Sequence, residues 1–529
     1  MTGESQAYFG DIHNHCNMSY AHGDLSDAIA NARQRLDFCS VTGHAHWTDM
    51  PARNGRIDHI IDFHERGFAK LAGNWQESLR TVAAGNEPGR FLTFPGFEVH
   101  SSANGDRTIV YRDLEGELLY PETIEELQSR VRELTEAGRA AIALPHHIGY
   151  HQGARGINWD SFDETTSPIV EIYSMHGAAE TTEGPIPYLH SMGPPDWRST
   201  VQYGLASGHV FGFSGNTDHH SAHPGSYGHG MTGLWAPELS REAVWQAIHR
   251  RRTFALTGDR MRLDYRVRDS RQGDTLMGGI RPPGPVEGLT VELAGGAAID
   301  YVDIVYNNRL ARRVVPRESY PTGGASPAPG AAPDRHPDAP GDRIRSRITL
   351  ELGWGPRNTA VNWNVDFGIT EGTVRDVDPR FRGQDVLSPE QEAEGAESTF
   401  FSSWRHLDDR SVHFETVTRG NPTSSTSGTQ GVSLEVEVPR NATIWAQING
   451  VRTETTVERL MAGGKSGHLR HEIDSPAWLF HRVPEEHELY WNLDLGDFTP
   501  DMQPGDFLYL RVRQENNHWA WGSPIFCRA

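Results

Sequence analysis

Hydrophobic residues recur at three- and four-residue intervals in four segments of the first half of the chain. This spacing places them on one face of an α-helix. The predicted helices cover residues 24–36, 57–84, 121–138 and 241–252. In the third segment, Pro121 suits the first turn of a helix and Gly138 suits its end.

Short apolar runs lie between these predicted helices, and each ends in a residue that can bind a metal ion. The six runs cover residues 9–15, 40–44, 94–100, 142–147, 170–176 and 213–220. Alternating strands and helices predict a parallel sheet, either open or closed into a barrel. Active sites in such folds lie at the carboxyl ends of the strands, which is where these residues fall.

The pattern changes after about residue 260. Alternating or β-branched runs, separated by Gly, Pro and Asn, predict an antiparallel β domain of the sandwich type. We therefore expect an α/β domain over residues 1–260 and a β-rich accessory domain over residues 261–529. Residues 321–342 are rich in Pro, Ala and Gly, which predicts an insertion without a packed core.

Composition narrows the classes of function. The 529 residues carry a net charge of -21, which opposes binding to a nucleic-acid backbone. The three cysteines form no C-x-x-C pair, so neither a zinc knuckle nor a disulfide framework is indicated. No apolar run approaches the ~18 residues of a membrane span, and the N-terminus lacks a signal-peptide pattern. We expect a cytoplasmic protein.

Histidine is abundant, with 27 residues against 49 Lys and Arg, and it is the commonest transition-metal ligand. The candidate ligands are His13, His15, His22, His44, Glu98, His146, His176, Asp218 and His220. Mixed imidazole and carboxylate ligands suit zinc, iron or manganese. This set exceeds the needs of one ion, so we expect two or three divalent transition-metal ions, with Glu98 as a bridge.

Each candidate also has a structural interpretation. A single histidine such as His22 or His176 is more often an ordinary packed residue, and Asp218 could be a turn residue. Glu98 on an apolar strand is costly to bury without a partner. Metal binding accounts for all of these residues together. We expect the neighbouring histidines to support the ligands or contact substrate: His100, His147, His151, His219 and His223.

The order of these motifs resembles the PHP (polymerase and histidinol phosphatase) superfamily of metal-dependent hydrolases. The resemblance spans about residues 7–260. The matching motifs are Asp11-x-His13-x-His15, Val41-Thr42-Gly43-His44, Gly96-Phe97-Glu98, Pro145-His146, Ser174-Met175-His176 and Asp218-His219-His220. With the β-rich C-terminal part, the chain looks like a bacterial PHP-like branch.

The resemblance implies a distorted (β/α)7 barrel with up to three metal ions. It also implies one ligand set of His13, His15, Glu98 and Asp218, a second of Glu98, His146 and His176, and a third of His22, His44 and His220. The chain departs from the family at Gly43, where members often have an aspartate, and in the spacing between His15 and His22.

We expect hydrolysis of a small-molecule phosphate ester, with a metal-bound hydroxide attacking phosphorus. Glu98 and Asp218 would serve the catalytic metals, and Arg107 and Arg155 could bind an anionic group. His151, His219 or His223 could protonate the leaving oxygen.

Two other functions fit the same residues. The metals could instead support cleavage of a carboxylic ester, lactone or amide, because they would do similar work there. Alternatively, they could stabilise a non-catalytic binding module. The sequence leaves open the role of the β-rich part and whether the chain forms a homo-oligomer.

Overall fold

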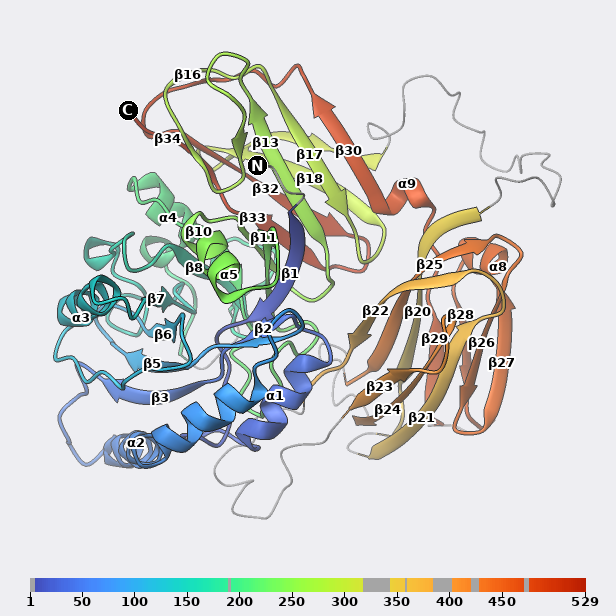
Figure 1. The fold of residues 1–529 in the computed structure, drawn as a ribbon, viewed down its shortest axis with the longest axis horizontal. Coiled ribbons are helices and arrows are strands. Elements are labelled where there is room, and N and C mark those ends of the chain that lie inside the picture. The colour runs from blue at the N-terminus through green and yellow to red at the C-terminus, as the bar shows by residue number, and fades with distance from the viewer. Residues whose placement is uncertain are drawn as a thin grey trace.

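The chain folds into three parts (Figure 1). This is a computed structural model, and it describes residues 5–188, 192–316, 343–356, 359–383, 402–419, 428–470 and 475–529. We call residues 5–260 the N-terminal lobe, residues 262–316 with 484–529 the β lobe, and residues 343–483 the sandwich. The predicted insertion at 321–342 lies outside the described residues.

The four predicted helices are present in the N-terminal lobe, together with a short fifth helix that was not predicted. They are α1 (Leu25–Arg33), α2 (Asp58–Gly85), α3 (Ile124–Glu136), α4 (Val201–Ala206) and α5 (Arg241–His249). Side-chain oxygens of Thr123 and Ser240 accept backbone N–H hydrogen bonds at the starts of α3 and α5. No helix in the described part of the chain combines the length and hydropathy that a bilayer crossing requires.

The strands of the N-terminal lobe form three ladders. The first contains β1 (Gln6–Asp11), β2 (Phe38–Cys39), β4 (Leu92–Thr93), β11 (Met231–Ala236) and β12 (Thr253–Leu256). The second contains β3 (Thr42–Trp47), β5 (Gly96–His100), β6 (Arg107–Tyr111) and β7 (Ala141–Pro145). The third contains β8 (Ile169–Ser174), β9 (Gly177–Ala178) and β10 (Gly212–Gly215).

These ladders correct the expectation of a parallel barrel. Hydrogen-bonded pairing among the described strands does not close into a barrel. β6 runs antiparallel to both β5 and β7, and β11 runs antiparallel to β1. Residues 101–106, which join β5 to β6, are too few for the crossover that a parallel pair requires, so the chain returns antiparallel.

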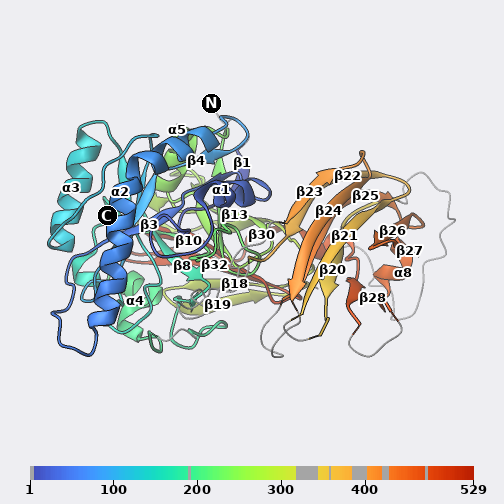
Figure 2. The same ribbon diagram turned by 90° about the horizontal axis from the view of Figure 1, so that it is seen from below.

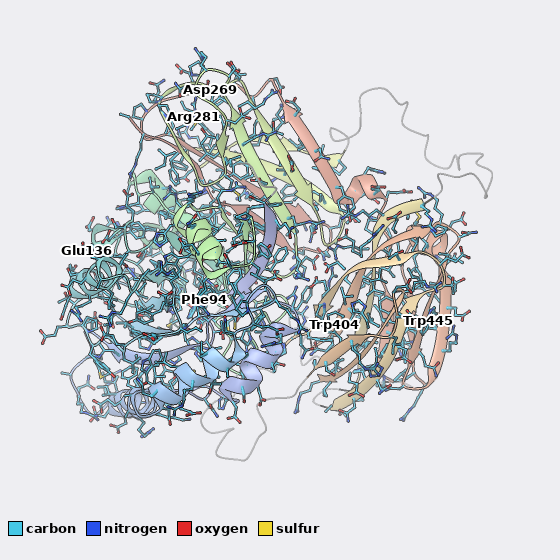
Figure 3. The ribbon with its side chains drawn as sticks, viewed as in Figure 1. Phe94, Glu136, Asp269, Arg281, Trp404 and Trp445 are labelled. Atoms are coloured by element: carbon cyan, nitrogen blue, oxygen red, sulfur yellow. The ribbon has the colours of Figure 1, made fainter. Side chains whose placement is uncertain are left out.

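The β lobe combines chain segments from both sides of the sandwich. Its strands are β13 (Arg262–Arg268), β14 (Thr275–Leu276), β15 (Ile280–Arg281), β16 (Gly284–Pro285), β17 (Gly288–Ala294), β18 (Ile299–Tyr306), β19 (Arg309–Val314), β30 (Tyr490–Leu495), β31 (Asp501–Met502), β32 (Phe507–Gln514), β33 (Trp519–Gly522) and β34 (Ile525–Cys527), with the helix α9 (Glu486–Leu489). β33 pairs with β12, so part of this lobe continues the first ladder into an 11-stranded sheet. Inside the lobe, Arg281 and Asp269 form a buried ion pair at 2.8 Å (Figure 3).

The sandwich consists of two five-stranded sheets that pack face to face. One contains β20 (Arg343–Gly353), β22 (Thr373–Arg380), β25 (Gln430–Pro439), β28 (Lys465–His468) and β29 (Ala477–Phe480). The other contains β21 (Ala360–Ile369), β23 (Ser403–His406), β24 (Ser411–Arg419), β26 (Thr443–Ile448) and β27 (Val451–Thr456), and the helix α8 (Val457–Met461) follows β27. Ile348 and Leu350 of β20 pack with Phe367 of β21 in the core, whereas Arg347 and Thr349 face outward.

The predicted C-terminal β character is confirmed, but residues 261–529 form two β units instead of one. The sandwich lies beside the other two parts as a separate body (Figure 2). At the boundary, the indole N–H of Trp404 donates to the carbonyl of Gln34 at 2.9 Å (Figure 3). Local periodicity identifies strands, but it does not reveal that β33, near the end of the chain, pairs with β12.

Candidate metal centre

The centre is built where the segments that follow β1 and β10 run side by side. His13 and His15 follow β1, and Asp218 follows β10. The backbone N–H of Asp218 donates to the carbonyl of His13, and that of His15 donates to the carbonyl of His219, both at 2.8 Å. These hydrogen bonds hold two imidazoles and one carboxylate at the same end of the lobe.

His44 and Glu98 come from inside strands and not from their ends. β3 and β5 pair in parallel with His44 opposite Glu98, and the register shifts between His44 and His46. Such a bulge redirects side chains along a strand. His146 directly follows β7, and His176 lies two residues beyond β8.

Glu98 is surrounded by four imidazole Nε2 atoms and by Nδ1 of His100, which is 3.0 Å away. Its carboxylate oxygens are 3.4 Å from Nε2 of His15, 3.6 Å from Nε2 of His13, 3.6 Å from Nε2 of His44 and 3.2 Å from Nε2 of His146. Asp218 forms a second focus. Its Oδ1 is 3.0 Å from Nε2 of His15 and 3.4 Å from Nε2 of His13, and its Oδ2 is 2.7 Å from Nε2 of His176.

Four of the histidines that face these carboxylates have Nδ1 held by a side chain farther from the centre, which we call the outer partner; Nδ1 of His15 has none in the described structure. The contacts are His13 to Glu171 (2.8 Å), His44 to Ser19 (2.9 Å), His146 to Thr108 (3.0 Å) and His176 to Tyr150 (2.8 Å). His220 Nδ1 lies 2.8 Å from the carbonyl of Asp218. A carbonyl oxygen can only accept, so Nδ1 of His220 carries the hydrogen and its Nε2 presents a lone pair.

Burial and mutual proximity keep several imidazoles neutral. Burial and the nearby His15 lower the pKa of His44 well below its ordinary value, and they lower that of His220 to about 3. For His13 the balance is reversed. Burial lowers its pKa, but the nearby Asp218 and Glu171 raise it by more, so the pKa lies well above the ordinary value. Neutral imidazole is the form that binds a metal ion.

Few cationic side chains lie beside the carboxylates of the centre. Burial opposes ionisation of Glu98, but His100, His146 and His44 hold its pKa well below the usual range. The buried carboxylates are Glu98, Asp106, Glu171 and Asp218. In the described part of the chain, Arg155 is the one Lys or Arg side chain paired with any of them, at 2.5 Å from Asp106.

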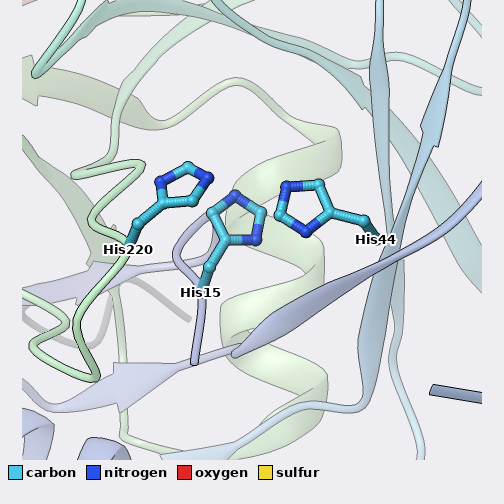
Figure 4. A group of neighbouring side chains, drawn as sticks. All are labelled: His15, His44 and His220. Atoms are coloured by element: carbon cyan, nitrogen blue, oxygen red, sulfur yellow. The ribbon is translucent and has the colours of Figure 1, made fainter. Parts of the chain in front are cut away.

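Potential ligand atoms gather in four overlapping groups. These are His13, His15 and Asp218; His15, His44 and His220; His44, Glu98 and His100; and Glu98, Asp106, His146 and His147. Figure 4 shows the imidazoles of His15, His44 and His220 next to one another. The ring centroids are 4.1 Å apart for His15 and His44 and 4.3 Å apart for His15 and His220.

The donor set fits transition-metal ions. Nε2 of His146 is buried and makes no hydrogen bond in the described structure. Nε2 of His13 and Nε2 of His15 lie only 3.3 Å apart beside two ionised carboxylates. A metal ion would satisfy these lone pairs together, which no neighbouring donor does.

A cavity of about 370 Å³ opens over the centre. Its polar lining includes Glu98, Asp218 and Arg155, together with His22, His44, His147, His176 and His220. Its apolar wall is formed by Ala21, Phe63, Met175 and Met192. A small molecule could therefore reach both carboxylates.

The structure brings eight of the nine predicted ligands into contact around Glu98 and Asp218. His22, the ninth, lines the cavity and its backbone N–H donates to the carbonyl of His220, but its side chain joins none of the four groups in the described residues. Of the predicted substrate residues, Arg155 and His147 line the cavity. His100 is not part of the cavity lining, and its Nδ1 is 3.0 Å from Asp106.

Four predicted functional residues lie away from the cavity, which corrects their assignment. Arg107 is inside β6, is 1% exposed, and donates to the backbone carbonyls of residues 104–106. His151 is on the surface beside Asp196, at 2.6 Å. His219 and His223 are buried outside the cavity lining, with ring centroids 6.1 Å apart.

Sequence reasoning missed Asp106, Glu171 and His64. Asp106 precedes β6 and accepts from the backbone N–H of Ser101, and Glu171 lies within β8. Glu171 is a carboxylate in an apolar strand, the same signal that identified Glu98. His64 comes from the buried face of α2 and lines the cavity, and its sequence position gives no distinct signal.

Comparisons with known proteins place the chain among largely uncharacterised sequences. A family model described as a protein of unknown function, DUF3604, matches residues 210–268. An uncharacterized protein of Chlamydia pneumoniae is 25% identical over 286 residues, which cover 49% of this chain and 45% of that protein. An uncharacterized protein of Chlamydia trachomatis serovar D is 24% identical over 257 residues, 44% of this chain and 39% of that protein. The chain thus spans less than half the length of these curated relatives.

One solved structure is similar in part. It is a two-domain protein from Bacteroides vulgatus that contains a predicted PHP-like metal-dependent phosphoesterase. The match has 14% identity and a TM-score of 0.30, and it covers 57% of this chain and 79% of that chain. This TM-score does not establish a shared fold, so the functional proposal rests on the metal centre.

Proposed function

We propose that this protein is a metal-dependent hydrolase that holds two or three divalent transition-metal ions, Zn²⁺, Mn²⁺ or Fe²⁺. One observation carries the proposal. His13, His44, His146 and His176 each have Nδ1 at an outer partner and Nε2 between 2.7 and 3.6 Å from Glu98 or Asp218. Outer partners of this kind fix the ring orientation of metal-ligating histidines.

The charges support more than one ion. Four buried carboxylates lie among the imidazoles, and Arg155 alone among the described Lys and Arg side chains pairs with them. Two divalent cations would offset this excess of negative charge, since buried charge needs a counter-ion.

The ligand groups suggest how the ions would be held. His13, His15 and Asp218 would hold one ion, and Glu98 would bridge it to a second at His146. His44 and His220 would hold a third, with His22 close by on the cavity wall. His176 contacts Asp218 and not Glu98, so we assign it to the Asp218 side of the centre.

Bound metal ions at such a centre polarise a substrate oxygen and lower the pKa of water. The protein itself supplies positioning. Arg155 lines the cavity and could bind an anionic group of the substrate with two parallel hydrogen bonds. Glu98 and Asp106, both within 3.8 Å of its guanidinium, fix its position.

We propose a small-molecule phosphate ester as the substrate. A volume of about 370 Å³ lies at the small end of the usual range for ligand pockets, roughly 300–1,000 Å³. Arg155 and the metal ions would together compensate a phosphate dianion. A carboxylic ester, lactone or amide is the second candidate, because Phe63, Met175 and Met192 line the cavity and Arg155 is already paired with Asp106.

The test combines elemental analysis with a substrate screen. The full chain, purified without added metal, would be measured for bound Zn, Mn and Fe and assayed on aryl phosphates, aryl esters and lactones. Asp218→Asn is the site variant. His151→Ala is the matched control, because His151 is exposed and lies away from the centre.

We expect at least two equivalents of metal and phosphatase turnover in the wild type and the control, and loss of both in Asp218→Asn. Turnover of esters or lactones alone would replace the phosphoesterase proposal by the second candidate. Metal at full occupancy without turnover on any class would support a binding module. One equivalent or less would contradict the multinuclear centre.

A further inference from the structure

A second polar cavity lies between the sandwich and the β lobe, away from the metal centre. Two adjoining hollows of about 220 and 140 Å³ share Thr349, Arg380, His481 and Asn516 in their linings. We call them together the cleft. Arg347, Thr349 and Arg380 come from the sandwich, whereas residues 296–298 and Asn516 come from the β lobe. The cleft shares none of its lining residues with the metal-centre cavity.

Arg347 is the unusual residue of this cleft. It lies on the outward face of β20 and is 4% exposed. Its Nη2 donates to Glu435 at 3.0 Å, but Nε and Nη1 are buried and have no hydrogen-bond partner in the described structure. Buried guanidinium donors are normally satisfied, since each unsatisfied group is costly.

Positive charge exceeds negative charge beside Arg347. The guanidinium groups of Arg345 and Arg262 approach the same carboxylate, Glu435, with Arg345 Nε at 2.7 Å and Arg262 Nη2 at 3.8 Å. The nearest other carboxylate is that of Asp376, at 3.9 Å from Arg347. The buried carboxylate of Glu435 is therefore shared by three arginines.

The carboxylates of the cleft wall are already engaged. Glu351 contacts His481 at 2.7 Å, and Glu515 accepts from Arg482 at 2.9 Å. Arg380 pairs with Asp259 at 2.9 Å, and its Nε lies 3.7 Å from Asp378, which is beyond hydrogen-bond distance. An anion in the cleft would meet arginine donors without a free competing carboxylate.

We propose that the cleft binds a small oxyanion, either inorganic or the carboxylate of a small organic acid, through the free donors of Arg347. Arg380 and Arg482 line the same cleft and add positive charge. Both units wall the cleft, and the arginine donors come from the sandwich. A ligand that binds the folded protein but not the unfolded chain raises thermal stability, and the rise follows the logarithm of ligand concentration once that concentration exceeds Kd.

The experiment measures thermal unfolding of the metal-free full chain at rising sulfate or succinate concentration. Sodium chloride keeps the ionic strength constant, so general screening does not contribute. Arg347→Gln is the test variant. Arg345→Gln is the matched control, because Arg345 lies two residues away on β20, bonds the same Glu435 and does not line the cleft. Arg155→Gln controls for anion binding at the metal centre.

We expect Tm to rise logarithmically with anion concentration in the wild type and in both controls. In Arg347→Gln the rise should begin at an anion concentration at least about 10-fold higher, because a charge-assisted contact is lost. A response to sulfate alone identifies an inorganic ligand, and a response to succinate alone identifies an organic acid. Equal responses of the wild type and Arg347→Gln would overturn the proposal, as would an equal loss in Arg345→Gln.

Diffraction gives a second measurement that does not depend on the folding of any variant. Crystals of the wild type soaked in selenate should show an anomalous peak beside Arg347 in the cleft. A soak that places selenium elsewhere but not there would overturn the proposal.

Discussion

Two buried clusters of charged side chains differ in how their charge is balanced. The metal centre contains Glu98, Asp106, Glu171 and Asp218 against Arg155. The second cluster, which we call the interface network, contains Arg35, Asp259, Asp378 and Arg380. It has as many arginines as aspartates, whereas the metal centre has a large excess of carboxylates.

Ion pairs and hydrogen bonds connect the interface network, although Asp378 Oδ2 and Arg380 Nε make no hydrogen bond in the described structure. Arg35 donates to Asp378 at 3.0 Å and to the carbonyl of Gly225 at 2.9 Å. Asp259 accepts from Tyr227 at 2.8 Å and from Gln514 at 2.7 Å, and it pairs with Arg380. The network joins all three parts of the molecule using the chain's own residues.

The comparison separates a structural role from a functional one. Buried charges are tolerated when they are paired and hydrogen-bonded, as in the interface network. The carboxylates of the metal centre have few such ion-pair partners, and several imidazole nitrogens and carboxylate oxygens instead lie close to one another. Clusters with strongly perturbed ionisation that face a cavity are typical of functional sites. External cations are therefore the natural completion of the metal centre but not of the interface network.

The largest expected effect is from Glu98→Ala. Glu98 is the carboxylate that four imidazole Nε2 atoms surround, so we expect loss of bound metal and an activity loss of more than about 100-fold, since even an outer partner of a ligand is worth 10–100-fold. Elemental analysis and steady-state assays measure both. The sandwich should stay folded, and metal content at the wild-type value would remove Glu98 from the centre.

The next largest effect is on stability, from Asp378→Ala. Removing this carboxylate leaves Arg35 buried without its ion-pair partner, which costs about 3–5 kcal/mol in the free energy of unfolding. Urea unfolding followed by tryptophan fluorescence measures the change. Glu437→Ala, which removes the exposed partner of Arg375, is the control and should change stability little. Loss of bound metal in Asp378→Ala would break the distinction between the two clusters.

Much of the fold follows from local sequence pattern. The spacing of Ile61, Leu71 and Trp75 predicts α2, and alternation predicts β20 and β25. The direction of β6 could not be predicted in this way. It depends on the shortness of the connection at residues 101–106 and on which strand has an unpaired edge next to β6. Pairing of β12 with β33 is equally invisible, since it joins residues more than 260 positions apart.

The candidate site shows the same division. Histidines after short apolar runs were predictable, because strand ends meet at one side of the lobe. Asp106 and Glu171 were missed, because outer partners are defined by what they contact and not by position in a motif. Arg107 was predicted to bind an anionic group, but it begins β6 and its guanidinium is buried against backbone carbonyls.

A smaller effect on metal binding is expected from Glu171→Gln, which tests an outer partner of the metal centre instead of a ligand. Glu171 accepts from His13 Nδ1 and from the amide of Asn216, at 2.8 and 3.1 Å. Glutamine keeps the shape but not the charge, so we expect metal affinity to fall about 10–100-fold and turnover to recover at saturating metal. Competition with a fluorescent chelator measures the affinity. Glu164→Gln, which removes an exposed partner of Arg528, should leave it unchanged.

The smallest expected effect is the pH dependence of the interface network. Burial raises the pKa of Asp378, but Arg35 and Arg380 lower it by more than burial raises it. The pKa therefore lies below the ordinary value. A carboxylate whose pKa is depressed by folding stabilises the protein above its unfolded pKa of about 3.9, and this contribution is lost as the pH falls through the folded value. The difference in unfolding free energy between the wild type and Asp378→Ala should therefore shrink from pH 5 to pH 3. Both proteins would be measured without metal, because ligand protonation would otherwise add its own acid dependence. A constant difference would show that Asp378 stabilises the network by packing and not by charge.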